Sequence, residues 1–342
     1  MSDPRPLLAT LLALHERIRD SVVAACERQD TAELSEVAAE EVGDTIYRID
    51  RVSEELILAG LASIAERESL VLVAEGLPEE GVTLPAGTAA EACRWRIIFD
   101  PIDGTRGLMF QKRSAWILTG VAPNRGAATR LSDITLAVQT EIPLVKQHLS
   151  DQLHAVRGEG VVATRFDRVR RVSWPLELVP SRADSIDHGF ATVARFFPGV
   201  RDELAAIDDE VVAQVLGPPV AGKAACFEDQ YACTGGQLYE LMAGHDRFVA
   251  DIRPLMEGIR SKRGLPRGLS CHPYDLCTAL IARELGVEVT DPFGEPLDAP
   301  MDLDSDVAWV GYANGRLRAR VEPALQGVLR KRRLVPDPDG AT

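Results

Sequence analysis

The sequence predicts a layered α/β fold, and three observations lead to this prediction. Apolar residues recur at helical spacing in the N-terminal part of the chain. Short apolar segments between residues 69 and 164 have the length and composition of strands. Helical and strand-like segments then alternate from residue 201 onward. With 342 residues, 46% of them hydrophobic, the chain is long enough for one large α/β domain or for two domains of ordinary size.

Two helices are predicted at the N-terminal end. The first covers about residues 7–26, where apolar side chains recur every three to four positions. The second is predicted over about residues 36–66, with a possible break at Gly43. Asp50 lies one turn from Ile46 and therefore beside the apolar stripe of this helix. It is either a carboxylate on the solvated rim or a residue of a functional site.

Two predicted strands end in carboxylates. The segment 69–76 ends with Glu75, and the strand 96–99 is followed by Asp100 and Asp103 in the motif DPIDGT. We expect the proline of this motif to stop the strand, because its ring removes a hydrogen-bond donor. Neighbouring strands that end in this way bring the three carboxylates to one edge of a sheet.

Carboxylates this close repel one another, so we expect a cation between them. Mg²⁺ prefers oxygen ligands and is commonly held by one or two carboxylates together with phosphate oxygens of a substrate. The carbonyl oxygen of Ile102 lies between Asp100 and Asp103 and is a third candidate ligand. A strand-to-turn motif with solvated carboxylates is the alternative interpretation.

The middle of the chain is predicted to form an antiparallel meander. Segments 114–122, 133–141 and 151–164 follow one another as strands, and glycines 158 and 160 suit a tight hairpin. We divide the chain into an N-terminal half, 1–168, with the main metal-binding loops, and a C-terminal half, 169–342, in one compact unit with the site between them. In the second half we predict helices at 201–216, 235–243 and 321–334 and strands at 247–252, 287–290 and 307–312.

Another carboxylate, Asp275, opens a further predicted helix. Pro273 stands in the first turn, where helices tolerate proline, and Gly286 stands where helices stop. The helix dipole favours a carboxylate in the first turn even without a metal. Helix capping and metal binding are therefore both open interpretations of Asp275.

The composition excludes several classes of function. A net charge of −14 disfavours binding to a nucleic acid polymer or an anionic membrane, since both require a basic surface. The sequence has no apolar run near the roughly 20 residues of a membrane span, and its start lacks the features of a signal peptide. The six cysteines form no CxxC pair, so neither a zinc site nor a disulfide framework is indicated. We expect a soluble, cytoplasmic protein with reduced cysteines.

Taken in order, these residues resemble the inositol monophosphatase family. That family belongs to a superfamily of Mg²⁺-dependent, lithium-sensitive phosphatases that includes fructose-1,6-bisphosphatases and bisphosphate nucleotidases. The resemblance rests on the order of the acidic residues, on DPIDGT, and on Tyr274 and Asp275 opening a helix that ends in glycine. Segments 155–160 and 289–297 are similar as well, and the resemblance extends over about residues 44–314. It implies a layered α-β-α-β-α sandwich, two or three Mg²⁺ ions and a homodimer.

The resemblance also implies roles for single residues. One metal ion would be bound by Glu75, Asp100 and the carbonyl of Ile102, and a second by Asp100, Asp103 and Asp275. Glu75 and Thr105 would orient the attacking water, with Asp50 hydrogen-bonded to Thr105. The substrate phosphate would lie against Asp103, Gly104, Thr105 and Asp275.

Several positions depart from the family pattern. Gly76 follows Glu75 where a second glutamate is usual, Tyr274 replaces a tryptophan, and the usual upstream basic residue has no counterpart. These departures affect the substrate more than the reaction. We expect Mg²⁺-dependent hydrolysis of a small phosphate monoester of a sugar, cyclitol or nucleotide. The alternative is a catalytically silent module of the same fold that binds a metal or a phosphate ligand for regulation.

Three cations follow the metal loop, namely Arg106, Lys112 and Arg113. A guanidinium presents paired donors that match phosphate oxygens. On this hypothesis the three side chains bind an additional anionic group of the substrate, and a sugar or nucleotide bisphosphate is preferred over an inositol phosphate. A solvated loop is the alternative interpretation.

Overall fold

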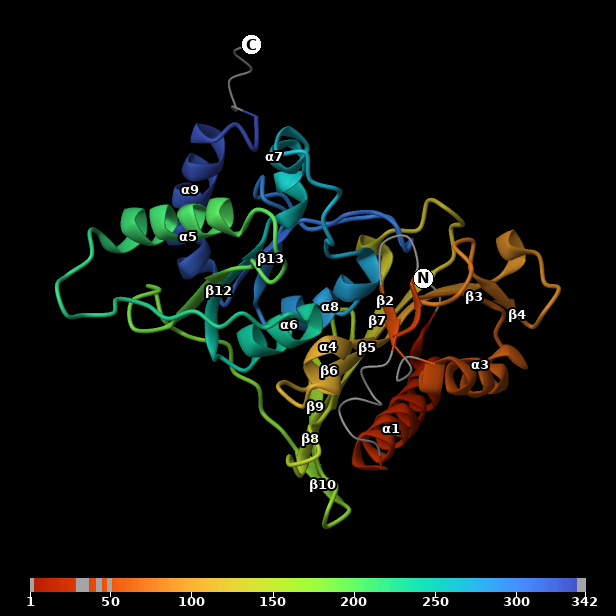
Figure 1. Ribbon diagram of the computed structural model, residues 1–342. Helices are drawn as coiled ribbons and strands as arrows, with labels where there is room; N and C mark the ends of the chain where they lie inside the picture. The colour runs from red at the N-terminus through yellow and green to blue at the C-terminus, as the bar shows by residue number, and fades with distance from the viewer. Residues whose placement is uncertain (1–2, 29–36, 41–44, 48–50, 337–342) are drawn as a thin grey trace.

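The computed structural model describes residues 3–28, 37–40, 45–47 and 51–336, and in them helices and sheets alternate in five layers (Figure 1). Two helices cover one face of a large sheet, two shorter helices lie between this sheet and a smaller one, and two further helices cover the outer face of the smaller sheet. The predicted α-β-α-β-α arrangement is therefore confirmed. In this order the helices are α1 (Arg5–Arg28), α3 (Arg51–Ala65), α6 (Thr234–Met242), α8 (Ala279–Glu284), α5 (Arg201–Leu216) and α9 (Gly315–Lys331).

The large sheet has eight strands in the order β10-β9-β8-β7-β6-β5-β3-β4. From β5 to β10 each strand pairs antiparallel with the next, as the predicted meander requires, whereas β3 and β5 are parallel. Parallel pairing places the C-terminal ends of β3 and β5 at the same edge. The strands are β3 (Leu70–Ala74), β4 (Val82–Leu84), β5 (Trp95–Asp103), β6 (Ala115–Pro123), β7 (Leu136–Ile142), β8 (Leu149–Val156), β9 (Val161–Asp167) and β10 (Val172–Pro175).

The smaller sheet has four strands in the order β11-β12-β14-β13. Two short helices lie outside the layers: α4 follows β5 and packs on β6 of the large sheet, and α7 lies in the C-terminal half. The strands are β11 (Phe190–Val193), β12 (Asp246–Asp251), β13 (Glu288–Thr290) and β14 (Trp309–Tyr312), and the short helices are α4 (Thr105–Met109) and α7 (Glu257–Lys262).

Apolar side chains pack on both faces of the large sheet. On one face, α1 buries the residues that recur every three to four positions, among them Leu7, Leu11, Leu14 and Ile18. On the other face a second cluster joins the sheet to α6, α8 and the smaller sheet. Alternation along each strand divides its side chains between these two cores. In the described part of the chain, no helix is both long and apolar enough to cross a membrane.

The predicted second helix, 36–66, is wrong in its first half. Among the residues of this range that the structure describes, only those of α3 are helical, while β1 (Val37–Glu40) and β2 (Thr45–Tyr47) form an antiparallel pair before it. Short apolar segments rich in β-branched residues fit either structure by periodicity, and here strand pairing prevails.

Other boundaries differ from the prediction for local reasons. The helix expected from Pro273 to Gly286 is a 3₁₀ turn, Pro273–Leu276, followed by α8, because Thr278 between them leaves the helical backbone. The last helix begins at Gly315 and not at 321, since Asn314 caps it by accepting hydrogen bonds from two backbone N–H groups. Strands β10 and β11 were not predicted.

Candidate active site

A bulge in β5 turns both aspartates of the DPIDGT motif toward the same face of the sheet. Residues three apart in a regular strand point to opposite faces. The register shifts between Asp100, which pairs with Leu118, and Asp103, which pairs with Trp116. Leu118 and Trp116 are two residues apart and pack in the same core, so the one extra residue of β5 brings both carboxylates to that side. The prediction that the strand stops at Pro101 is therefore wrong, because the bulge accommodates the proline and β5 continues to Asp103.

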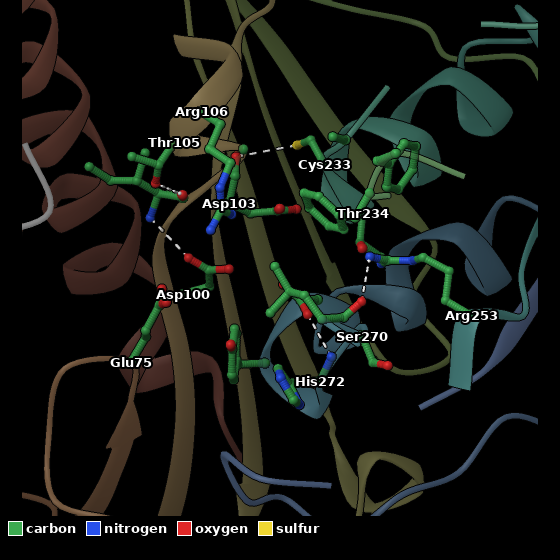
Figure 2. A pocket seen from close by; sticks show the side chains of 18 residues that line it. Glu75, Asp100, Asp103, Thr105, Arg106, Cys233, Thr234, Arg253, Ser270 and His272 are labelled. Atoms are coloured by element: carbon green, nitrogen blue, oxygen red, sulfur yellow. Dashed lines mark hydrogen bonds between the residues drawn. The ribbon is translucent and has the colours of Figure 1, made fainter. Parts of the chain in front are cut away.

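Glu75 reaches the same place through the parallel pairing of β3 with β5. Ala74, the last residue of β3, pairs with Phe99, so the next residues of the two strands, Glu75 and Asp100, lie side by side. In Figure 2 Glu75 points toward Asp100 from the adjoining strand. The sequence-based expectation that two strand ends deliver carboxylates to one edge is met by this pairing.

Asp275 comes from the other half of the chain. It lies in the 3₁₀ turn Pro273–Leu276, where one carboxylate oxygen accepts a hydrogen bond from the backbone N–H of His272 at 2.6 Å. Oxygen atoms of Asp100, Asp103 and Asp275 all lie within 4.8 Å of one another. Capping and clustering therefore coexist at Asp275, and capping does not exclude metal binding.

The carboxylates of this cluster have raised pKa values, which a nearby cation would lower. Burial, together with the charges of Glu75, Asp103 and Asp275, raises the pKa of Asp100 well above its ordinary value. Burial and the charge of Asp275 raise the pKa of Asp103 to about 8, and burial raises that of Asp275 to about 6. Ionising all of these groups at neutral pH is costly unless a positive charge lies among them.

The N-terminal end of α6 holds Asp103 in place. The backbone N–H of Gly235 donates to Oδ2 of Asp103 at 2.5 Å, and Cys233 donates from its thiol to the Asp103 carbonyl. Gly104 adopts a left-handed backbone (φ 93°), and a Cβ there would lie 2.9 Å from Cβ of Cys233. Only glycine permits this turn and this close approach.

Thr105 lies directly behind this turn as the first residue of α4. Its hydroxyl donates a hydrogen bond to the carbonyl of Ile102 at 2.7 Å. The two residues predicted as metal ligand and water-orienting group are thus in direct contact. Asp50, the predicted partner of Thr105, lies outside the described residues.

The carboxylates form one side of a cavity of about 690 Å³, part of it open to solvent. Its other side was not predicted from the sequence and is built around Arg253, whose guanidinium points inward in Figure 2. Both oxygens of the fully buried Asp251 accept hydrogen bonds from this guanidinium, and the rings of Phe196 and Phe197 lie 5.0 and 5.2 Å from it. Further lining residues are Ala232, Cys233, Thr234, Leu269, Ser270, His272 and Tyr274.

A signal for part of this wall was present in the sequence. The predicted strand 247–252 carries Asp251 at its end, in the manner of Glu75 and Asp100. The same strand-end argument would have drawn attention to Asp251 and to Arg253 beside it. Phe196 and Phe197 follow a short strand that the periodicity did not reveal, and nothing local marks them.

The three cations after the motif are not brought together. Arg106 lines the cavity and lies 5.5 Å from the ring of Phe197. Arg113 forms an ion pair with Asp229 and stacks on Tyr231, and Lys112 is exposed. Among the described residues that line the cavity, Arg106 is the only member of this predicted group.

Comparisons with known proteins show which solved structures share this fold. No protein-family model and no curated protein matches the sequence. A Leishmania major fructose-1,6-bisphosphatase matches with a TM-score of 0.65 at 13% identity, over 94% of this chain and 93% of that one. The chain has the fold of the inositol monophosphatase-like phosphatases.

Two further solved structures support this statement. The extragenic suppressor protein SuhB from Bartonella henselae matches with a TM-score of 0.59 at 17% identity, over 94% of this chain and 98% of that one. An IMPase from Thermotoga maritima matches with a TM-score of 0.60 at 14% identity, over 95% and 99%. The resemblance drawn from the sequence motifs is confirmed for the fold of nearly the whole chain.

The donor set fits a hard divalent cation. Within the described chain the cluster Asp100, Asp103 and Asp275 offers only carboxylate oxygens, with Glu75 and the Ile102 carbonyl lining the same cavity. Oxygen ligands of this kind suit Mg²⁺, Ca²⁺ or Mn²⁺ and do not select zinc or copper.

Proposed function

We propose that the chain is a Mg²⁺-dependent phosphatase that hydrolyses a small phosphate monoester of a sugar, cyclitol or nucleotide. The observation that carries this proposal is the convergence of Asp100, Asp103 and Asp275 from two halves of the chain on one cavity. Burial and mutual repulsion raise the pKa values of these carboxylates, and a bound cation would offset both effects. The fold that the chain shares with a fructose-1,6-bisphosphatase and an IMPase supports the same reaction class.

The residues divide into metal ligands and groups that handle water and phosphate. Glu75, Asp100, Asp103, Asp275 and the Ile102 carbonyl would hold two or three Mg²⁺ ions. When bound, these ions would neutralise charge on the phosphoryl oxygens and on the leaving oxygen.

The chain itself would orient the reacting groups. Thr105 and Glu75 lie on the same side of the cavity and would hold the attacking water by hydrogen bonds. Backbone N–H groups of Gly104 and Thr105 would face the phosphate. Asp50 would accept the hydrogen of the Thr105 hydroxyl, as the family resemblance implies, in place of the Ile102 carbonyl that accepts it in this structure.

The wall opposite the carboxylates would receive the remainder of the substrate. Arg253 supplies positive charge there, and Phe196 and Phe197 supply apolar surface. Arg106 starts beside Thr105 on the carboxylate side, and its guanidinium lies near the ring of Phe197. We retain Arg106 as a substrate-binding residue. For Lys112 and Arg113 the solvated-loop interpretation is favoured, since the first is exposed and the second is paired with Asp229.

The remaining parts of the proposal concern partners and location. We propose a cytoplasmic homodimer, by the family resemblance, with a small phosphorylated metabolite as its ligand. A nucleic acid polymer or a membrane is disfavoured as a partner by the net charge of −14.

The test is phosphate release from a panel of phosphorylated sugars, cyclitols and nucleotides, with Mg²⁺ and with EDTA. We expect turnover of at least one monoester that EDTA abolishes and added Mg²⁺ restores. Metal binding without turnover of any member would favour the silent regulatory module. Turnover that EDTA leaves unchanged would contradict the metal-dependent mechanism.

A further inference from the structure

One fully buried polar side chain outside the cavity lining connects the two segments that carry metal ligands. Gln139 lies in the middle of β7 and is 0% exposed. Its neighbours across the sheet are Leu118 on one side and Leu153 on the other, and Leu118 in turn pairs with Asp100. Because directly paired residues share a face of the sheet, Gln139 lies on the face that carries the carboxylates.

Each end of this amide bonds a different segment of the C-terminal half. Nε2 of Gln139 donates to the carbonyl of Gly235 at 2.8 Å, and Oε1 accepts from the hydroxyl of Thr278 at 2.9 Å. Thr278 is also fully buried. The amide lies on the sheet face that α6 and α8 cover, and it connects the start of α6 with the residue that precedes α8.

Both bonded residues are close to a proposed metal ligand. Gly235 donates from its own N–H to Oδ2 of Asp103, so Gln139, Gly235 and Asp103 form a continuous chain of hydrogen bonds. Thr278 lies three residues after Asp275, just beyond the 3₁₀ turn that carries this carboxylate. Asp103 and Asp275 are therefore held relative to each other through one glutamine side chain.

The packing at Gly235 makes this chain sensitive to position. A Cβ at this residue would lie 2.6 Å from Leu118 Cδ2 and 3.1 Å from Asp103 Oδ2. The start of α6 is thus pressed directly onto the sheet beside the carboxylate. A shift of Gly235 would move the donor that fixes Asp103.

A buried amide between two leucines needs a physical reason. Leaving such a group without partners is destabilising, and an apolar residue of similar shape would avoid that cost. Here the amide supplies a hydrogen-bond partner to the carbonyl of Gly235 and to the hydroxyl of Thr278. Residues that orient metal ligands from behind affect metal affinity although they do not touch the ion.

We infer that Gln139 is a positioning residue of the metal site, which sets the separation of Asp103 from Asp275 through Gly235 and Thr278. This inference rests on the proposed metal-dependent function. It assigns to Gln139 an effect on metal affinity that a residue with a purely structural role would not have.

The test is Mn²⁺ binding, measured by electron paramagnetic resonance of free Mn²⁺, in the full-length protein and in Gln139→Met. Loss of an outer ligand-orienting group typically weakens metal binding roughly 10–100-fold. We expect a weakening in this range. The matched control is Gln152→Met, since Gln152 also uses its amide to bond a backbone carbonyl, Leu12, and a hydroxyl, Thr140.

Gln152 pairs directly with Thr140 and so lies on the α1 face of the sheet, away from the carboxylates. Gln152→Met should therefore lower thermal stability while Mn²⁺ affinity stays within twofold of the parent. A second pair covers the case in which Gln139→Met fails to fold. Thr278→Val should weaken Mn²⁺ binding, and Thr278→Ser, which keeps the hydroxyl, should restore it.

The outcomes separate this inference from the proposed function. If the parent protein binds Mn²⁺ and both Gln139→Met and Thr278→Val bind it equally well, the positioning role is overturned and the function stands. If Gln152→Met weakens binding as much as Gln139→Met, the effect is a general loss of stability and the inference is also overturned. If the parent protein binds no Mn²⁺, the proposed function and the inference fall together.

Discussion

The two faces of the large sheet each bury a polar centre, and adjacent residues of β7 belong to different ones. Gln139 faces α6 and α8 and bonds the segments that carry metal ligands. Thr140, the next residue, faces α1, where the ring of His15 lies between the hydroxyls of Thr140 at 3.0 Å and Thr119 at 2.7 Å. The Gln139 side chain and the His15 ring are both fully buried, and each bonds two polar groups, yet only Gln139 is connected to the carboxylates by the hydrogen bonds of the described residues.

This difference shows that burial of polar groups does not by itself mark a functional region. On the α1 face, the His15 centre joins a helix to the sheet and lies among apolar residues. On the other face, the bulge of β5, the start of α6 and the turn of Asp275 meet at a cavity. Substitutions on the cavity face should therefore change activity or metal binding, and those on the α1 face should change stability alone.

The largest effect is expected for Asp100→Asn. Asp100 lies beside Glu75 and clusters with Asp103 and Asp275. It is proposed to contact both metal sites, so its loss should weaken both. Turnover with Mg²⁺ should fall by more than the roughly 100-fold typical of residues that only orient ligands. Steady-state kinetics across a Mg²⁺ series measures this, and near-normal Mg²⁺-dependent turnover would remove the shared-ligand assignment.

A smaller loss is expected for Thr105→Ala. The hydroxyl is proposed to position the attacking water and is not a metal ligand, so kcat should fall roughly 10²-fold while Mn²⁺ affinity changes little. Thr105→Ser keeps the hydroxyl and should retain most of the activity. Equal activity of the alanine and serine variants would remove Thr105 from the catalytic residues and, with it, the reason for assigning Asp50 a role.

Substitutions of the two arginines after the metal loop, Arg106 and Arg113, should differ in their effect on substrate binding. Arg106 lines the cavity, and a charged hydrogen bond to substrate is worth about 1.5–3 kcal/mol, so Arg106→Ala should raise KM at least roughly tenfold. Arg113 is paired with Asp229, and Arg113→Ala should change KM less than twofold. Comparing the two KM values on the best substrate of the panel tests this assignment, and a larger effect at Arg113 would reverse it.

On the α1 face, His15→Gln should leave activity unchanged and alter the pH dependence of stability. Burial lowers the pKa of His15 to about 3, against an ordinary value of about 6.5 in the unfolded chain. Between these values the unfolded chain takes up a proton that the native state does not, so the free energy of unfolding falls as the pH decreases. This contribution is roughly 2 kcal/mol between pH 7 and pH 5.

Urea unfolding at the two pH values measures this contribution as the difference between the parent protein and His15→Gln. The exposed His148 supplies the control, since His148→Gln should follow the parent. A loss of turnover per folded molecule in His15→Gln would show that the two faces are coupled.

Local patterns were sufficient to predict the carboxylates but not the geometry that joins them. The strand ends at Glu75 and Asp100 and the helix start at Asp275 are visible in the sequence, because turn residues and apolar runs mark them. The bulge that turns Asp103 to the same side depends on pairing with β6, and no periodicity within β5 reveals it.

The wall around Arg253 and the role of Gln139 depend on contacts between segments far apart in the chain. In the sequence Gln139 is a single polar residue in an apolar segment. Its partners, Gly235 and Thr278, are 96 and 139 positions away, so no local pattern indicates its role. The fold was predictable for the opposite reason, since α1 and the meander are long, regular and marked by turns. The short segments at β1, β2 and β11 have too few residues for periodicity to distinguish strand from helix or loop.

The proposed metal site is tested most directly by a crystal structure of the protein grown with Mn²⁺, with an anomalous difference map calculated at the manganese edge. We expect at least one strong peak within ligand distance of both Asp100 and either Asp103 or Asp275, and the loss of this peak in Asp100→Asn. A map in which the fully occupied manganese lies elsewhere, or in which these carboxylates stay without a peak at a saturating Mn²⁺ concentration, would contradict the proposed site.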